Sequence, residues 1–422
     1  MSAGRAEAII DRLHGLYPKL IDLSLDRLER LLAQLDHPER KLPPVIHVAG
    51  TNGKGSTCAF LRAMGEAAGL RIHVYTSPHL VHFNERIRLA GKLVSDQALA
   101  DALAEVERVN ASAPITVFEV LVAGAFLLFA RVPAELCVVE VGLGGRGDAT
   151  NVIAKPAASA ITSISLDHRE MLGDTVALIA VEKAGIMKQA VPVVTGTQSA
   201  EVLAILDGHA ARAGTRVQAR DRDWTIMATP DGLLFSDAAG ALDLPRPSLL
   251  GAHQYDNAGI AVAAMRASKF AVPDAAVAQG IATAEWPARM QRLTGRLATM
   301  LPADWELWLD GGHNPGGGEA IAGVLAQWRD RPVHLVVGMK KAKDSAEFLR
   351  PLLPHVATLW AVAEPGQHLA LSVEAIAAAS GGVARLGPTV VAALAQLPRG
   401  GGPARVLICG SLYLAGEVLK AV

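Results

Sequence analysis

The sequence is poor in cysteine, in net charge and in long hydrophobic runs, and each scarcity excludes a class of protein. It has three cysteines in 422 residues, scattered and without a CxxC pair, so a disulfide framework is excluded and a reducing cytoplasm is expected. The formal net charge is -1, which argues against nucleic acid as a partner because domains that bind it usually carry a basic face. The longest apolar run, Val120–Ala130, is far shorter than the roughly 20 residues that span a bilayer, so no membrane partner is expected.

What the sequence does contain is a high apolar fraction and a regular alternation of patterns. Hydrophobic residues make up 51% of the chain, which excludes disorder and provides a core for two or three compact domains. Short β-type runs alternate with helical patterns, and this predicts an α/β fold of parallel sheets flanked by helices. The expected strands are Val45–Ala49, Arg71–Tyr75, Leu136–Val141, Ala160–Ile164, Val191–Thr195, Glu306–Leu309, Val333–Val337, Leu359–Val362 and Val406–Cys409.

Two changes in the pattern divide the chain. A segment with period-two alternation and turn residues, 216–244, predicts a small β-meander. The α/β alternation then restarts after about Leu297, which places a boundary near Thr294–Arg296. We therefore expect two domains, 1–295 and 296–422.

A glycine-rich turn, 50–57, follows the first expected strand and leads into a helical pattern. A turn of this kind directs backbone N–H groups and a helix dipole at one point, which makes a cradle for an anion. Lys54 adds a cation for the terminal phosphates of a nucleotide, and Ser56 or Thr57 offers a hydroxyl near Mg²⁺. The spacing departs from the ordinary phosphate loop, because Val48 stands at its first glycine position. We predict a nucleotide-binding site; the alternative is a glycine turn with an exposed lysine.

A second glycine-rich segment, Gly142–Gly147, matches the G-x-G-x-x-G fingerprint directly after an expected strand. Asp167 lies about where a ribose-binding acid would stand, so this segment taken alone indicates an NAD-dependent oxidoreductase. The fingerprint has to open a helix, however, and residues 148–151 with Lys155-Pro156 predict a turn and an extended segment. The oxidoreductase is therefore kept only as the alternative from a different class.

Three further places in the sequence, with four titratable residues among them, point to metal and phosphate chemistry. Glu119 opens an apolar helix, where a buried charge needs a partner or a cation. Asp167 and His168 follow an expected strand at its carboxyl end, where α/β sheets place their sites. Lys183 lies in the next helix. Each has a plain structural alternative: a helix N-terminal acid, a loop histidine and a solvated lysine. Together with the phosphate loop, they predict a metal and phosphate site.

The phosphate loop resembles that of the Mur ligase superfamily, and further strings resemble its folylpolyglutamate synthase branch, which includes the bifunctional dihydrofolate synthases. The resemblance runs in order through nearly the whole chain. The strings that carry it are 75–80, 84–87, 139–146, 148–151, 166–168, 182–186, 312–315 and 410–414.

The resemblance implies an ATP-binding domain with a modified phosphate loop, followed by a smaller Rossmann-like domain. It implies an ATP-dependent ligase in which a folate-side carboxylate takes the γ-phosphate and the amine of L-glutamate attacks the acyl phosphate. Dihydropteroate, folates, L-glutamate and ATP are the implied substrates, with two Mg²⁺ ions. The alternative within the superfamily is a cell-wall amino-acid ligase, against which the strings 77–80 and 410–413 argue.

The resemblance also implies roles for individual residues. Ser77 and Glu119 would ligate the first Mg²⁺, and His168 would help to hold the second. Lys183, rather than the nearby Lys188, would be the lysine that CO₂ carbamylates. The implied ATP-binding residues are Gly50, Thr51, Asn52, Gly53, Lys54, Gly55, Ser56, Asn257, Arg289 and Asp310, and the implied catalytic residues are Lys54, Lys183 and His313.

Four positions depart from the pattern of the branch. Gly147 stands where leucine is usual, Ala288 replaces a glycine, Gly312 replaces an alanine and Ala342 replaces an acid. These departures concern the shape of the pterin pocket and of the loop 338–344, and not the ligase chemistry.

Overall fold

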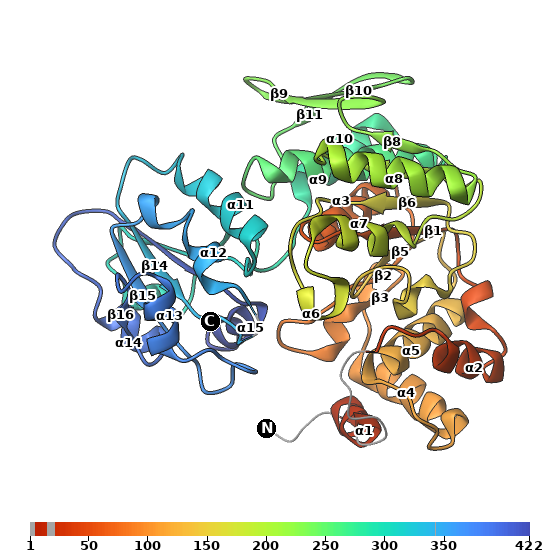
Figure 1. Cartoon of the computed structure of the whole chain (residues 1–422), viewed down its shortest axis with the longest axis horizontal. Coiled ribbons are helices and arrows are strands. Elements are labelled where there is room, and N and C mark those ends of the chain that lie inside the picture. Colours follow the sequence, from red (N-terminus) through yellow and green to blue (C-terminus); the bar gives the residue numbers. More distant parts are fainter. Residues whose placement is uncertain (1–4, 15–21, 342) are drawn as a thin grey trace. The chain divides into compact units, whose positions relative to one another are not determined.

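The computed structural model describes residues 5–14, 22–341 and 343–422, which form two compact units (Figure 1). We call them the N-terminal and the C-terminal unit. The N-terminal unit comprises Met1–Ile164, Leu172–Ser248 and Tyr255–Ala284. The C-terminal unit comprises Glu285–Val422 together with two short segments, Ser165–Met171 and Leu249–Gln254. The division in the structure thus comes ahead of the boundary predicted at 295/296.

An eight-stranded sheet in the order β4-β3-β2-β5-β1-β6-β7-β8 is the centre of the N-terminal unit. The strands β2, β5, β1, β6, β7 and β8 run parallel to one another. At one edge of the sheet, β3 and β4 pair in the antiparallel direction. The middle strands are buried on both faces, which explains why they are mostly apolar. The bounds are β1 Val45–Ala49, β2 Ile72–Tyr75, β3 Ile87–Leu89, β4 Lys92–Leu93, β5 Leu136–Glu140, β6 Ala158–Ile161, β7 Val193–Thr195 and β8 Val217–Ala219.

Helices cover both faces of this sheet. Tyr75 and Val139 belong to the core under the helices α1, α2, α4 and α5. Ile72 points to the opposite face, because side chains alternate along a strand, and there it packs on Gly65 of α3. The helices of the unit are α1 Arg5–His14, α2 Asp26–Gln34, α3 Lys54–Ala67, α4 Asp96–Asn110, α5 Val117–Arg131, α7 Val176–Ala184, α8 Ala200–Ala213, α9 His253–Ala267 and α10 Asp274–Thr283.

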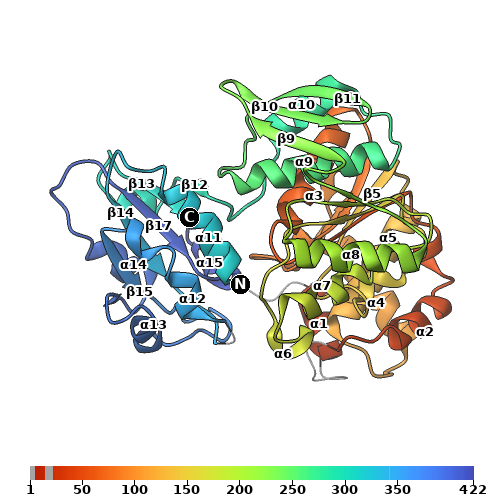
Figure 2. The ribbon, with the colours of Figure 1, turned by 45° about the horizontal axis from the view of Figure 1, so that its top comes forward.

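The predicted meander is present as a three-stranded antiparallel sheet, β11-β10-β9. Its strands are β9 Trp224–Ala228, β10 Gly232–Asp237 and β11 Gly240–Pro245. Figure 2 shows them side by side near α9. Trp224 packs so closely on Gly259 of α9 that a Cβ there would lie 2.5 Å from its ring.

The C-terminal unit has a six-stranded sheet in the order β12-β13-β17-β14-β15-β16, parallel apart from β12. Its strands are β12 Gln291–Leu293, β13 Glu306–Leu309, β14 Val333–Val337, β15 Thr358–Ala361, β16 Arg385–Leu386 and β17 Arg405–Cys409. Its helices include α11 Pro315–Leu325, α12 Ser345–Leu349, α13 Val373–Ala379, α14 Val390–Ala395 and α15 Leu412–Lys420. The predicted two-domain α/β fold is confirmed. Within the described residues, no helix is long and apolar enough to cross a bilayer.

Candidate functional site

The predicted phosphate loop joins β1 to α3 and has the strand–turn–helix form that the sequence implies. Gly53 precedes the helix with φ 91°, in the left-handed region that suits glycine. Its α-carbon leaves no room for a side chain, because a Cβ would lie 2.2 Å from Oδ1 of Asn257. Gly50 is held in the same way against Thr162, whose Oγ1 would be 1.8 Å from a Cβ. The structure therefore places Asn257 beside the loop, and its contact with the nucleotide stays a prediction.

Two lysines converge on this loop. Nζ of Lys54 donates to the carbonyl oxygens of Gly50 and Thr51 at 3.1 and 3.3 Å. Nζ of Lys183, a side chain only 4% exposed, donates to the same Gly50 oxygen at 2.8 Å. Lys188, the competitor for the carbamylated position, instead donates to the carbonyl of Asn151. The two ammonium groups make the turn a positive site, which suits the terminal phosphates of a nucleotide.

The first turn of α3 adds two hydroxyl groups. Ser56 and Thr57 are buried, and among the described residues neither hydroxyl has a hydrogen-bond partner. Leaving a buried polar group unpaired costs about 1–3 kcal/mol, so hydroxyls in this state are suited to meet a ligand. They stand where a phosphate loop presents its hydroxyl to a bound metal ion or phosphate.

A carboxylate that the sequence analysis missed lies at the adjacent strand ends. Glu140 is the last residue of β5, which pairs with β1 on one side and β2 on the other. Its side chain is 4% exposed, and its Oε2 accepts the backbone N–H of Ser77 at 3.2 Å. The signal in the sequence is a single acid at the carboxyl end of an apolar strand, next to the strand that feeds the phosphate loop. Glu140 and Ser77 together offer oxygen ligands, which Mg²⁺ prefers.

Glu119, the acid predicted as a metal ligand, is engaged elsewhere. It forms a capping box with Thr116 at the start of α5, and its Oε2 also accepts Nε of Arg27 at 3.2 Å. Its other oxygen, Oε1, is buried without a partner in the described part of the chain. Capping and ion pairing account for Oε2, so of the two acids Glu140 has the geometry that suits a metal next to Ser77.

His168 and Asp167 belong to the C-terminal unit, where Asp167 gathers several donors. His168 has a left-handed backbone (φ 50°) and a side chain 38% exposed. The Asp167 carboxylate accepts from Asn314 at 2.8 Å, forms an ion pair with Lys343 and lies 3.5 Å from Nε2 of His313. Burial alone would raise the pKa of Asp167, but the hydrogen bond and charge of His313, with the charge of Lys343, hold it well below its usual range.

The remaining predicted residues of the C-terminal unit lie around the end of β13. Asp310 accepts the backbone N–H groups of Met290 and Gly312 at 2.8 and 2.7 Å, so it shapes the turn. His313 donates from Nδ1 to the carbonyl of Gly311 at 2.8 Å. Arg289 donates to the carbonyl of Ala288 at 2.8 Å. The structure thus brings Arg289, Asp310 and His313 to one end of the sheet.

Two of the four departures from the family pattern, Gly147 and Gly312, have a local explanation. Gly147 packs against Leu23, where a Cβ would lie 2.9 Å from the backbone oxygen, so no leucine would fit. At Gly312 a Cβ would lie 2.8 Å from Ile321. Ala288 has φ 54°, a conformation that glycine adopts with less strain. Ala342 lies outside the described residues.

The Gly142–Gly147 segment does not form a dinucleotide site. It leads into a short 3-10 helix, Ala149–Val152, and its conformation is set by Asp148, whose carboxylate accepts the N–H groups of Leu143 and Thr150. A Cβ at Gly145 would lie 2.6 Å from the carbonyl of Glu182 in α7. The glycines permit this close helix approach, and the oxidoreductase alternative is not favoured.

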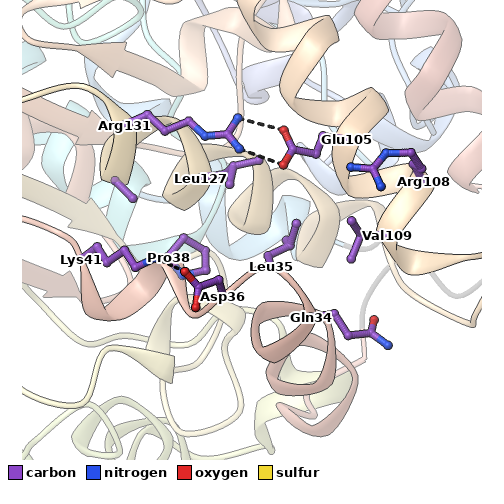
Figure 3. Close-up of a pocket in the computed structure, with 11 residues that line it drawn as sticks. Gln34, Leu35, Asp36, Pro38, Lys41, Glu105, Arg108, Val109, Leu127 and Arg131 are labelled. Carbon is purple, nitrogen blue, oxygen red and sulfur yellow. Dashed lines mark hydrogen bonds and ion pairs between the residues drawn. The ribbon is translucent and has the colours of Figure 1, made fainter.

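A cavity of about 460 Å³ lies near the carboxyl ends of α2, α4 and α5 (Figure 3). Four of the charged side chains that line it form ion pairs with one another. Arg131 donates to both oxygens of Glu105 at 2.8 and 2.9 Å, and Lys41 pairs with Asp36. The phosphate loop, by contrast, stands at the amino end of α3. The cavity is therefore not part of the site described above.

A phosphate loop at the carboxyl ends of a parallel sheet, two lysines and a neighbouring carboxylate define a nucleotide-dependent phosphotransfer or ligase protein. Family comparison agrees: residues 48–265 match the Mur ligase middle domain, and residues 296–421 match the dihydrofolate synthetase C-terminal domain. The chain belongs to the folylpolyglutamate synthase and dihydrofolate synthase family of the Mur ligases, as the sequence strings predicted.

Individual relatives cover nearly the whole chain. It is 33% identical over 412 residues to the dihydrofolate synthase/folylpolyglutamate synthase of Escherichia coli K12, covering 97% of this chain and 94% of that protein. The Bacillus subtilis protein of the same name is 33% identical over 427 residues, covering 97% of each. The structure of E. coli FolC with DHPP and ADP superposes with a TM-score of 0.89 at 32% identity, covering 100% of this chain and 98% of that one. A bifunctional relative with Mn, AMPPNP and L-glutamate bound gives 0.87 at 32% identity, with the same coverage.

Proposed function

We propose that this chain is an ATP-dependent ligase that adds L-glutamate to dihydropteroate, to reduced folate, or to both. The observation that carries the proposal is the meeting of Lys54 and Lys183 at the Gly50 carbonyl, beside the unpaired hydroxyls of Ser56 and Thr57. The relatives named above, bound to DHPP and ADP or to AMPPNP and L-glutamate, support the same substrates.

The reaction first brings two anions together, a carboxylate and the triphosphate of ATP, and then couples the activated carboxylate to an amine. A carboxylate oxygen of the folate-side substrate attacks the γ-phosphorus, and the bond to ADP breaks. The amine of glutamate then attacks the acyl carbon, phosphate leaves and the amine gives up a proton. Lys54 neutralises charge on the terminal phosphates, and the N–H groups at the start of α3 hold them in line for attack.

The site fits a divalent cation, which we propose to be Mg²⁺, with two ions in the active enzyme. Ser77, Glu140 and Ser56 are the oxygen donors that would hold the ion next to the phosphate loop. Within the described ranges, no three His, Cys, Asp or Glu residues cluster as a ligand set, which agrees with Mg²⁺ taking few protein ligands and several from phosphate and water. When bound, the ion supplies charge neutralisation between carboxylate and triphosphate. The roles predicted for Glu119 and His168 stay predictions.

Lys183 is the residue we propose to be carbamylated. Carbamylation replaces a buried ammonium with a carboxylate, and the 4% exposed side chain meets the phosphate loop directly. A neutral amine is needed for the reaction with CO₂, and burial favours the neutral form. The modified side chain would add a further oxygen ligand close to the phosphates.

Four residues from the second half of the chain complete the proposal. Asn257 and Arg289 would contact the nucleotide, and Asp310 and His313 would face the phosphates and the ribose, as the family resemblance implies. Support for Asn257 is its packing on Gly53. The cytoplasm remains the expected compartment, since Cys58, Cys137 and Cys409 are buried thiols.

Coupled measurement of ADP release tests the function. ATP, Mg²⁺ and L-glutamate are supplied with dihydropteroate, with tetrahydrofolate, or with both in competition. We expect ADP release that depends on glutamate and on at least one of the two substrates. Competition between them would show that one site serves both. Absence of glutamate-dependent release with either substrate would contradict the proposal.

A further inference from the structure

The Asp167 carboxylate is a meeting point for side chains from three parts of the C-terminal unit. Its Oδ1 forms an ion pair with Nζ of Lys343. Its Oδ2 accepts Nδ2 of Asn314 at 2.8 Å and lies 3.5 Å from Nε2 of His313. Its segment, Ser165–Met171, follows β6 in the chain yet packs with the C-terminal unit. One carboxylate thus ties this segment to the turn before α11 and to the loop after β14.

The Asp167–Lys343 ion pair is largely buried. The side chains of Asp167 and Lys343 are 9% and 10% exposed. Asn314 is the N-cap of α11, where its Oδ1 accepts the N–H of Gly317 at 2.8 Å while its Nδ2 turns to Asp167. A negative charge at a helix N-terminus is stabilised by the helix dipole, so the cap, the lysine and the carboxylate support one another.

This arrangement fixes two histidines. The backbone N–H of His168 donates to Oδ1 of Asp167 at 2.8 Å, which holds the left-handed turn from which the His168 side chain projects. The His313 ring donates from Nδ1 to the Gly311 carbonyl, and this turns its Nε2 toward Asp167. For the ligase site, the sequence singled out Asp167 only as a neighbour of His168 at a strand end, without a role of its own, and it did not single out Lys343.

We propose that Asp167 and Lys343 are positioning residues, whose ion pair sets the orientation of the His168 and His313 side chains for the ligase reaction. The inference rests on the proposed function. Asp167 acts through the histidines and does not itself contact the reacting atoms. Lys343 keeps the carboxylate in place and balances its charge.

The test compares Asp167→Asn with Asp330→Asn, which removes a carboxylate of the same unit that is 54% exposed and paired with Arg405. We expect Asp167→Asn to lower kcat roughly 100-fold, since small displacements at a reacting centre have effects of that size. The dissociation constant for ADP should stay within about twofold, because the phosphate loop, which we propose binds the phosphates of ADP, lies in the N-terminal unit and keeps all its residues. Asp330→Asn should match the wild type in both.

Lysine variants and a spectroscopic readout keep the proposal falsifiable. Lys343→Arg should retain most of the activity, and Lys343→Met should behave like Asp167→Asn. The ring-nitrogen chemical shifts of His168 and His313 should change in Asp167→Asn and Lys343→Met but not in Asp330→Asn.

Three results would overturn the proposal: an Asp167→Asn enzyme with wild-type kcat, unchanged histidine shifts, or loss of kcat only in step with ADP binding and thermal stability. A wild-type chain without glutamate-dependent ADP release would contradict the proposed function instead, and the histidine shifts would still decide the positioning role.

Discussion

Lys54 and Lys183 donate hydrogen bonds to one carbonyl oxygen, that of Gly50, although they lie on different helices, α3 and α7. Two ammonium groups this close repel each other unless an anion or a modification reduces the charge. The relationship therefore fits a site that takes a triphosphate and, in our proposal, a carbamate on Lys183. Both features can be tested separately.

Removal of the Lys54 side chain tests the phosphate loop. Lys54→Ala should lower kcat/KM roughly 1,000-fold, because an electrostatic group that stabilises the transferring phosphate is lost. The free energy of unfolding should hardly change. Steady-state kinetics and urea denaturation measure the two effects, and Lys92→Ala, on the exposed strand β4, is the matched control. A Lys54→Ala enzyme with wild-type kcat/KM would show that the lysine has no part in phosphate transfer.

Gly53 and Gly69 flank the same helix, α3, and differ in their surroundings. Both have positive φ, 91° and 78°. A Cβ at Gly53 would collide with Asn257, whereas a Cβ at Gly69 would have no atom within 4 Å. Gly69→Ala should therefore cost about 1 kcal/mol of stability, from the left-handed backbone alone, and leave ADP affinity unchanged. Gly53→Ala should weaken ADP binding roughly 10-fold or more, because loop and Asn257 must shift. Equal ADP affinity in the two variants, measured by calorimetry, would contradict the role of this close packing.

Glu140 and Glu119 are two candidates for one metal-binding role, and the same substitution distinguishes them. Glu140→Gln should raise the Mg²⁺ concentration for half-maximal activity about 10- to 100-fold. Glu119→Gln should leave that concentration unchanged and destabilise the fold by about 1–2 kcal/mol, since it weakens the capping box and the contact with Arg27. A Mg²⁺ titration of the activity of both variants distinguishes the two acids. A higher Mg²⁺ requirement in Glu119→Gln alone would support the prediction that Glu119 is the metal ligand.

Lys183→Met tests the carbamate. Loss of a ligand or charge at the phosphates should lower kcat roughly 100-fold, and acetate or formate should restore part of it if a carboxylate is what the site needs. Mass spectrometry of the native wild type should find the added mass of CO₂, and Lys188→Met should keep both the modification and the rate. An active wild type with an unmodified Lys183 would refute the assignment.

His47 predicts a pH dependence of stability. Burial, with the charge of Lys188, lowers the pKa of His47 to about 3. Because the unfolded chain takes up this proton near pH 6.5, the folded state loses stability as the pH falls from about 6.5 toward 3, by at most about 1.4 kcal/mol per pH unit. His47→Gln keeps an amide that can donate to Thr150 in place of Nε2 and should remove this loss.

Urea denaturation at neutral and mildly acidic pH measures the effect of His47, with His355→Gln, at a partly buried position, as control. The wild type should lose stability relative to His47→Gln only at the lower pH. An identical difference at both pH values would mean that His47 does not contribute through its proton.

The fold was predictable from the sequence wherever the residues of a single segment are enough to identify its structure. The run Val333–Val337 coincides with β14 because a strand buried on both faces is apolar at nearly every position; His334 is the one polar residue. The phosphate loop was predictable because its glycines, lysine and hydroxyls are contiguous. For β6 the prediction began two residues late, since Ala158 and Ser159 carry little strand propensity.

Residues that act through distant partners were not predictable. Glu140 is one acid in an apolar strand, and only its contact with Ser77, 63 positions away, identifies it. Lys343 lies 176 positions from Asp167, so no local pattern joins them. The metal role of Glu119 was predicted from the resemblance; its place at the start of an apolar helix could not decide, because a capping box gives the same signal as a metal ligand.

The central claim is that ATP activates a carboxylate of the folate-side substrate. Its most direct test supplies the substrate with ¹⁸O in that carboxylate, together with ATP, Mg²⁺ and L-glutamate, and analyses the released phosphate by mass spectrometry. The account predicts that the phosphate carries an ¹⁸O atom taken from the carboxylate, at the same rate as ADP appears. Phosphate free of ¹⁸O during glutamate-dependent product formation would contradict it.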